Sequence, residues 1–211
     1  MPRSRGSRRA LAPRPAAVAL LAAAVLLTGC DQGDPAAACD VDVDTAELRA
    51  LKADAAMADC PEGDPDAATD LPDVVLPCLG GGTETSLAGV EGPAIINFWA
   101  SNCQPCIKEM PALEQFHQRY GDRVQVIGVD FLDTYPGAAL DLAKRTGATY
   151  PSLADPCGSL QETDLVVATL PHFLFVRADG SVEPRPGGVD SLEEIVELAE
   201  THLRVDLAGR A

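Results

Sequence analysis

Residues 94–111 read A-I-I-N-F-W-A-S-N-C-Q-P-C-I-K-E-M-P. The apolar run 94–100 has the length and composition of a buried central strand. Residues 104–120 predict a helix directly after that strand, with one proline inside it. Cys103 and Cys106 therefore lie where a strand passes into the first turn of a helix, and we expect their sulfurs to be close enough to form a disulfide.

This position gives the two cysteines different roles. A helix N-terminus offers free N–H groups and a partial positive charge, and both stabilise a thiolate. Cys103 comes first and is expected to be the more exposed, so we predict that it is the nucleophile. Cys106, one turn further in, is the predicted resolving cysteine, which attacks the mixed disulfide and releases the product. The dithiol itself carries the electrons, so we expect no cofactor.

Two other interpretations of the C-x-x-C spacing remain open, namely half of a zinc site and a permanently oxidised structural bridge. Zinc usually needs four ligands. The sequence has no second C-x-x-C, and its three histidines, His117, His172 and His202, are far apart along the chain. We therefore predict no metal site, and the strand–turn–helix context favours redox chemistry.

The rest of the chain from residue 71 predicts further strands and helices. The predicted strands are 74–76, 124–130, 173–176 and 182–183, and the predicted helices are 136–145 and 191–203. Strands and helices alternate at first and end in a hairpin and a helix, which indicates a mixed sheet with helices on both faces. We predict an α/β domain over residues 71–211.

Residues 1–29 have the features of an export signal. They contain five arginines, no acidic residue and an apolar run at 16–27 that is too short to cross a membrane as a helix. Leu27-Thr28-Gly29-Cys30 resembles the bacterial lipobox, whose cysteine receives a lipid. We therefore predict a lipoprotein signal peptide, lipidation of Cys30 and an extracytoplasmic, membrane-attached protein. An ordinary secretory signal with an incidental cysteine is the alternative.

Residues 30–70 are rich in Ala, Asp and Pro and predict an acidic tether. Within it, residues 44–58 predict a short helix with Asp44 as its N-cap. Cys39 and Cys60 bracket this helix, and a disulfide between them would staple a segment that is too small to fold alone. Two unpaired thiols are the alternative.

The cysteine count agrees with export, because disulfides persist outside the cytoplasm. Seven cysteines are present, so lipidation of Cys30 would leave six, enough for three disulfides. Cys78 and Cys157 then remain to pair with each other, although spacing alone does not fix connectivity. If they lie close to the dithiol, they form a second redox relay instead.

The charge of the chain excludes one class of partner. The formal net charge is -16 at pH 7. Binding to nucleic acid requires a basic surface that neutralises phosphates. We therefore expect no nucleic-acid partner.

The block 97–111 resembles the active site of the thioredoxin superfamily, and it is most similar to the extracytoplasmic TlpA-like and ResA-like thiol–disulfide oxidoreductases. The shared features are a Trp before the dithiol, a Pro between the two cysteines and Pro111 five residues after the second cysteine. The resemblance spans about residues 71–204. It implies a thioredoxin-like fold, with Trp99, Gln104 and Pro105 beside the dithiol in the substrate-binding site.

The resemblance also implies a cis-proline that faces the dithiol just before a late strand. Pro171 is the matching residue here, because Leu170-Pro171 precedes the predicted strand 173–176. In this fold the backbone of the residue before that proline pairs with the bound substrate peptide. Leu170 and Pro171 are therefore the remaining predicted substrate-binding residues.

The chain departs from ordinary thioredoxins at the proton-transfer position. Those proteins carry a buried Asp on the central strand, where this chain has Asn97. TlpA-like and ResA-like proteins often have a Glu three residues after the second cysteine, which is Glu109 here. We predict that Glu109 takes the proton of Cys106; a solvated surface Glu is the alternative. His172 either lies near the dithiol and shifts its reduction potential or is an exposed imidazole.

The resemblance implies an enzyme that reduces disulfides in other proteins outside the cytoplasm. Apocytochrome c cysteines are one implied substrate, and a membrane thiol protein is the implied upstream electron donor. The direction of electron flow depends on a reduction potential that differs widely among such proteins.

Two alternatives to this function remain. A peroxiredoxin-like peroxidase shares the fold, although residues 98–102 do not follow the usual peroxidase pattern before the cysteine. A non-enzymatic acidic surface lipoprotein would instead bind a partner or a metal through residues 31–70.

Overall fold

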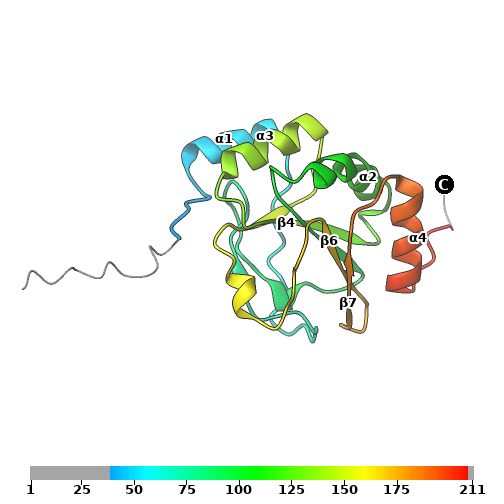
Figure 1. Cartoon of the computed structure of the whole chain (residues 1–211). Helices are drawn as coiled ribbons and strands as arrows, with labels where there is room; N and C mark the ends of the chain where they lie inside the picture. Colours follow the sequence, from blue (N-terminus) through cyan, green and yellow to red (C-terminus); the bar gives the residue numbers. More distant parts are fainter. Residues whose placement is uncertain (1–38, 209–211) are drawn as a thin grey trace, which may run out of the picture. The chain divides into compact units, whose positions relative to one another are not determined.

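A computed structural model describes residues 39–208 and contains a five-stranded mixed sheet in the order β5-β4-β3-β6-β7 (Figure 1). The strands are β3 (Ala94–Trp99), β4 (Gln125–Phe131), β5 (Ser152–Asp155), β6 (His172–Val176) and β7 (Val182–Pro186). The pairs β3–β4 and β4–β5 are parallel, whereas β3–β6 and β6–β7 are antiparallel. The predicted mixed sheet with a parallel start and a hairpin finish is confirmed.

Four α-helices contribute buried side chains to one core against the same face of the sheet. They are α1 (Ala46–Asp54), α2 (Gln104–Tyr120), α3 (Pro136–Thr146) and α4 (Leu192–Leu203). The strands β3, β4 and β5 follow one another in one direction, and right-handed crossovers place α2 and α3 on the same face. Helix α1 lies beside α3, and α4 lies beside α2 (Figure 1).

The other face of the sheet has a second core with no α-helix among the described residues. Its cover includes the short strands β1 (Val75–Leu76) and β2 (Thr85–Ser86) and the 3₁₀-helices η1 (Leu87–Gly89) and η2 (Ser159–Glu162). Helical segments thus occur on both faces, as predicted, but those on the second face are single short turns.

The central strand β3 separates the two cores, and all six of its residues are buried. Ile95 and Trp99 belong to the helix-covered core, whereas Ile96 and Phe98 belong to the opposite one. Alternate residues of a strand point to opposite faces, so a strand covered on both sides must be apolar throughout. The strand ends at Trp99, so the C-x-x-C turn lies at the carboxyl end of the central strand.

Helix α1 begins one residue later than the sequence predicted, and it ends at Asp54 instead of 58. Its N-cap is Thr45, whose Oγ1 accepts a hydrogen bond from the Leu48 backbone N at 3.2 Å. The predicted cap, Asp44, forms an ion pair with Arg49 at 2.6 Å instead. The prediction was wrong here because two adjacent residues can both cap a helix and only one of them is in position.

The predicted tether over residues 30–70 is corrected for its described part. Residues 39–70 pack against the domain, and their backbone bonds to it at several points. Gly80 N donates to Val43 O, Ala58 N donates to Thr149 O and Asp70 N donates to Gly180 O. The predicted signal peptide over residues 1–29 and the predicted lipidation site Cys30 lie outside the described residues. Within residues 39–208, no helix has the length and apolarity needed to cross a membrane.

Two disulfides connect the N-terminal part to the domain, and their pairing differs from the predicted one. Cys39 pairs with Cys157 and Cys60 pairs with Cys78, with Cα–Cα distances of 5.5 and 5.7 Å. The predicted Cys39–Cys60 and Cys78–Cys157 bonds are wrong. After α1 the chain runs along β5, so Cys60 and Cys78 both come to lie beside Ser152. Cys39 meets the loop after β5, a proximity that spacing along the sequence does not reveal.

Candidate active site

The C-x-x-C dithiol forms the first turn of α2. Cys103 is the N-cap of this helix, and Cys106 N donates a hydrogen bond to Cys103 Sγ at 3.3 Å. The two cysteines form a disulfide with a Cα–Cα distance of 5.3 Å. Cys103 is partly exposed, as predicted, whereas Cys106 is fully buried. A thiol or disulfide from another protein can therefore reach only the sulfur of Cys103.

Glu109, one turn after Cys106 on α2, is completely buried in the protein. Its Oε1 accepts a hydrogen bond from Asn97 Nδ2 at 2.9 Å, and its Oε2 accepts one from Val189 N at 3.3 Å. Burial raises the pKa of Glu109 to about 8, and these two hydrogen bonds oppose only part of that shift. The alternative of a solvated surface carboxylate is wrong.

The raised pKa makes Glu109 suitable for exchanging a proton with a thiol. An ordinary glutamate is too weak a base to accept a proton from a cysteine, whose reference pKa is about 8.5. A carboxyl group with a pKa of about 8 matches that value closely. Asn97 holds this carboxyl from the central strand, so the Asn that replaces the usual Asp has a positioning role.

The predicted proline loop lies next to Glu109. The Leu170–Pro171 peptide bond is cis, as predicted. A Cβ added at Gly188 would lie 2.8 Å from Glu109 Oε2 and 3.1 Å from Pro171 Cγ, so the backbone of Gly188 fits between the two. Leu170 is half-buried and packs against the same core as Cys106.

The structure separates the predicted substrate-binding residues into two groups. Gln104 and Pro105 are exposed at the start of α2, beside Cys103. Trp99 is fully buried, and its ring packs against Gly128 of β4. Trp99 therefore supports the sheet below the dithiol turn and cannot contact a substrate. This prediction was wrong because the side chain of Trp99 points into the helix-covered core.

His172 fits neither of its two predicted roles. Its ring is buried and packs edge-on against Phe98 with a centroid distance of 6.1 Å. Phe98 belongs to the core on the face opposite Cys106 and Glu109. Burial lowers the pKa of His172, and neither ring nitrogen has a hydrogen-bond partner among the described residues. His172 is a neutral core residue.

Sequence reasoning missed two acids near the dithiol turn, and one of them, Asp133, supports the turn directly. Asp133 accepts hydrogen bonds from Ser101 N at 2.7 Å and Tyr135 N at 3.0 Å. Asp130 is buried at the end of β4, beside Trp99. Burial raises the pKa of Asp130 well above its usual value, and the Asp133 carboxylate raises it further. The available signal was an acidic residue at the carboxyl end of a predicted buried strand.

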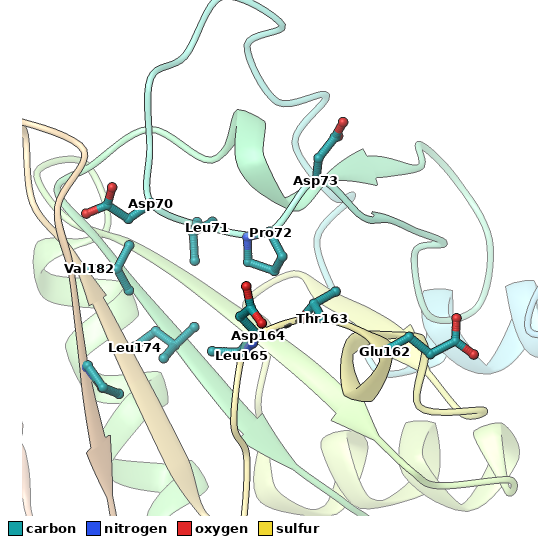
Figure 2. A pocket seen from close by; sticks show the side chains of 11 residues that line it. Asp70, Leu71, Pro72, Asp73, Glu162, Thr163, Asp164, Leu165, Leu174 and Val182 are labelled. Atoms are coloured by element: carbon teal, nitrogen blue, oxygen red, sulfur yellow. Dashed lines mark hydrogen bonds between the residues drawn. The ribbon is translucent and has the colours of Figure 1, made fainter.

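One hollow lies away from the dithiol, on the second face of the sheet. It has a volume of 530 Å³ and lies between residues 70–73, residues 162–165 and the β6–β7 hairpin (Figure 2). Four carboxylates surround Leu71, Leu165 and other apolar side chains there. No dithiol residue lines it. No cluster of potential metal ligands occurs within residues 39–208.

Comparison with known proteins assigns the family. Residues 67–185 match the AhpC/TSA family. The chain belongs to this family. Among curated relatives, the thiol-disulfide oxidoreductase ResA of Bacillus thuringiensis subsp. konkukian is 28% identical over 130 residues, covering 61% of this chain and 73% of ResA. The thiol:disulfide interchange protein HelX of Rhodobacter capsulatus is 32% identical over 127 residues, covering 49% of this chain and 70% of HelX.

Solved structures confirm the fold of this AhpC/TSA family member. The structure of DsbF from MTB (Mycobacterium tuberculosis), in mixed oxidised and reduced forms, superposes with a TM-score of 0.55 at 26% identity. It covers 61% of this chain and 94% of DsbF. The thioredoxin-like fold and the resemblance to ResA-like oxidoreductases are therefore confirmed.

Proposed function

We propose that this protein is an extracytoplasmic thiol–disulfide oxidoreductase that reduces disulfides in other proteins. One observation carries the proposal, namely the dithiol at the N-terminus of α2. It exposes Cys103, buries Cys106 and has a buried Glu109 with a pKa of about 8 one turn further on. The similarity to proteins named ResA, HelX and DsbF supports the same chemistry.

The first step is attack by the Cys103 thiolate on a substrate disulfide. One substrate sulfur bonds to Cys103 Sγ, and the other leaves as a thiolate that takes a proton from water. The N-terminus of α2 stabilises the attacking thiolate, and the Cys106 N–H points at its sulfur. The product is a mixed disulfide between Cys103 and the substrate.

The second step requires Cys106 to lose its proton inside the protein. Because Cys106 is fully buried, water cannot readily take this proton. The ionised form of Glu109 accepts it, and Cys106 then attacks Cys103 Sγ and releases the second substrate thiolate. The reaction ends with the disulfide seen in the structure and a reduced substrate. The dithiol carries the electron pair, so the reaction uses no other cofactor.

The substrate surface consists of the exposed residues around Cys103 and the proline loop. Gln104 and Pro105 lie on one side of the reactive sulfur. The backbone of Leu170, before Pro171, is available to pair with an extended substrate peptide. Recognition through the main chain tolerates many substrate sequences. Apocytochrome c cysteines are our proposed substrate, by resemblance to TlpA-like and ResA-like proteins.

The protein is proposed to act outside the cytoplasm on a lipid anchor. Two further disulfides, Cys39–Cys157 and Cys60–Cys78, agree with an oxidising compartment. The features of residues 1–29 and of Cys30 support export and lipidation. A reductase in such a compartment needs a supply of electrons, which we assign to a membrane thiol protein.

Substrate reduction by the purified protein tests this function. The reduced protein is mixed with two peptides joined by a disulfide, and release of the free peptides is followed by mass spectrometry. We expect release by the wild type and none by Cys103→Ser. A parallel incubation with hydrogen peroxide tests the alternative. Rapid peroxide consumption without peptide release would establish a peroxidase. The absence of both activities would support the non-enzymatic alternative.

A further inference from the structure

A disulfide beside β5, the edge strand of the sheet, lies next to a buried lysine. The side chain of Lys52, on α1, is only 8% exposed, and its Nζ lies 3.4 Å from Cys78 Sγ. The same Nζ donates hydrogen bonds to Gly81 O at 2.7 Å and Asp59 Oδ1 at 2.8 Å. Cys60 and Cys78 are both buried. An ammonium group is therefore fixed against one sulfur of a disulfide in the interior.

The two sulfurs of this bond have different surroundings, and these suit the reduced form. Cys60 Sγ lies 3.3 Å from the backbone oxygen of Ser152, whereas Cys78 Sγ lies 3.7 Å from it. A disulfide sulfur has no proton to donate to that oxygen. After reduction, a Cys60 thiol can donate to Ser152 O, and a Cys78 thiolate can accept from Lys52. Both groups formed by reduction already have a partner in place.

The ammonium would act more strongly on a Cys78 thiolate than on its carboxylate partner, Asp59. The Asp59 side chain is 82% exposed, so water and salt screen its interaction with Lys52. Cys78 is 1% exposed, so a thiolate there would be screened much less. A buried thiolate without a counter-charge would be costly. Lys52 supplies that counter-charge.

The Cys39–Cys157 disulfide provides a contrast in the same molecule. Both of its cysteines are exposed. Across residues 39–208, no side-chain nitrogen makes a hydrogen bond to either of its sulfurs. Cys157 Sγ lies 3.1 Å from the backbone oxygen of Cys39, so a thiol there has an acceptor, but this exposed bond has no ammonium group beside a sulfur to stabilise a thiolate.

We propose that Cys60–Cys78 is a second redox centre of this protein, with Lys52 as the residue that stabilises its reduced form. This goes beyond the proposed function, which uses only the Cys103–Cys106 pair. The reductant is an external dithiol, which reaches Cys60, the more exposed of the two cysteines, when the irregular segment around it opens.

The exchange balances in two steps. A reductant thiolate bonds to Cys60 Sγ, and Cys78 leaves as a thiolate held by Lys52; stabilising the leaving thiolate speeds this step. The second thiol of the reductant loses a proton to solvent. It then attacks the reductant's first sulfur, which is bonded to Cys60 Sγ in the mixed disulfide. Cys60 leaves, takes a proton from water and, as a thiol, donates a hydrogen bond to Ser152 O. The reductant becomes a disulfide, and the protein gains two electrons and one proton.

A redox titration in the full chain tests the proposal. The variant Cys103→Ser/Cys106→Ser removes the catalytic pair, so the result does not depend on the proposed activity. It is equilibrated with dithiol buffers of graded potential, quenched with acid, alkylated and analysed by mass spectrometry. We expect Lys52→Met to lower the equilibrium constant for reduction of Cys60–Cys78 about tenfold, which is about 30 mV for a two-electron couple.

Three controls make this result specific. Lys52→Arg keeps the charge and should restore most of the equilibrium constant. Asp59→Asn removes the competing anion at an exposed position and should raise the constant about twofold. The Cys39–Cys157 equilibrium should stay unchanged in every variant. If Lys52→Met does not fold, the equilibrium constants of Asp59→Asn and Lys52→Arg still test the proposal. The proposal would be overturned if the equilibrium constant for reduction of Cys60–Cys78 were the same in all folded variants. It would also be overturned if a variant shifted the constants of both disulfides equally.

Discussion

We expect the difference in unfolding free energy between the wild type and Glu109→Gln to change sign as the pH rises. Glutamine has the shape of a protonated glutamate and can still accept the hydrogen bond from Asn97. It cannot accept the one from Val189 N, because an amide nitrogen now faces that donor. At pH 4, where Glu109 is protonated in the folded protein and mostly protonated in the unfolded chain, we expect Glu109→Gln to be less stable than the wild type by about 1 kcal/mol.

The wild type should then lose stability as the pH rises. The pKa of Glu109 is about 8 in the folded protein, against an ordinary value of 4.5 that applies to the unfolded chain. The folded state therefore holds the proton more tightly, and the stabilisation is complete below pH 4.5 and lost as the pH rises towards 8. Above pH 4.5 the slope is about 1.4 kcal/mol per pH unit, which gives a loss of about 3 kcal/mol between pH 4 and pH 7. Glu109→Gln should therefore be the more stable protein at pH 7, by about 2 kcal/mol.

Urea unfolding at pH 4, 5, 6 and 7 with the disulfides intact measures this difference. Trp99 is the only tryptophan in the chain and is fully buried, so its fluorescence reports unfolding. The matched control is Glu197→Gln, which makes the same change at an exposed position on α4 and should follow the wild type. If the unfolding free energies of the wild type and Glu109→Gln changed in parallel over this pH range, the idea that buried Glu109 holds a proton would be refuted.

Other changes test the surroundings of the dithiol and the N-terminal part. Gly188→Ala places a methyl group against the Glu109 carboxylate, so we expect a loss of about 1–3 kcal/mol in urea unfolding and slower disulfide reduction; wild-type values in both would contradict the close approach. Asp133→Ala removes two hydrogen bonds to backbone N–H groups and should cost about 1–3 kcal/mol, a loss that should be absent if water replaces them. Replacing Cys39 and Cys157 with serine opens a loop of 118 residues and should lower the unfolding free energy by about 4–5 kcal/mol, and a loss under 1 kcal/mol would argue against that pairing.

Local sequence signals predicted most of the elements around the dithiol. The apolar run before Cys103 predicted the fully buried strand β3. Helix α3 begins at Pro136 and is followed by Gly147, as expected for helix-start and helix-end residues. Ser191 caps α4, where it accepts a hydrogen bond from Glu194 N at 3.2 Å. Each of these signals depends on neighbours within a few positions, which a single sequence displays directly.

Features that depend on distant contacts were not predictable in the same way. The pairing of Cys39 with Cys157 brings together residues 118 positions apart. Polarity suggested that residues 39–70 were a tether, yet a few apolar residues such as Leu48 bury enough surface to attach them to the domain. Trp99 was placed in the substrate site because it precedes the dithiol, but strand alternation directs it into the core.

The proposed mechanism requires that Cys103 alone exchanges with substrate disulfides, and trapping the intermediate tests this requirement. Reduced Cys106→Ser is mixed with a disulfide-linked peptide, and the mixed disulfide is mapped by mass spectrometry, with Cys103→Ser as the mirror control. We predict one peptide bound at Cys103 in Cys106→Ser and almost none at Cys106 in Cys103→Ser, because Cys106 is fully buried. Equal trapping in the two variants, or no trapping at Cys103, would contradict the mechanism.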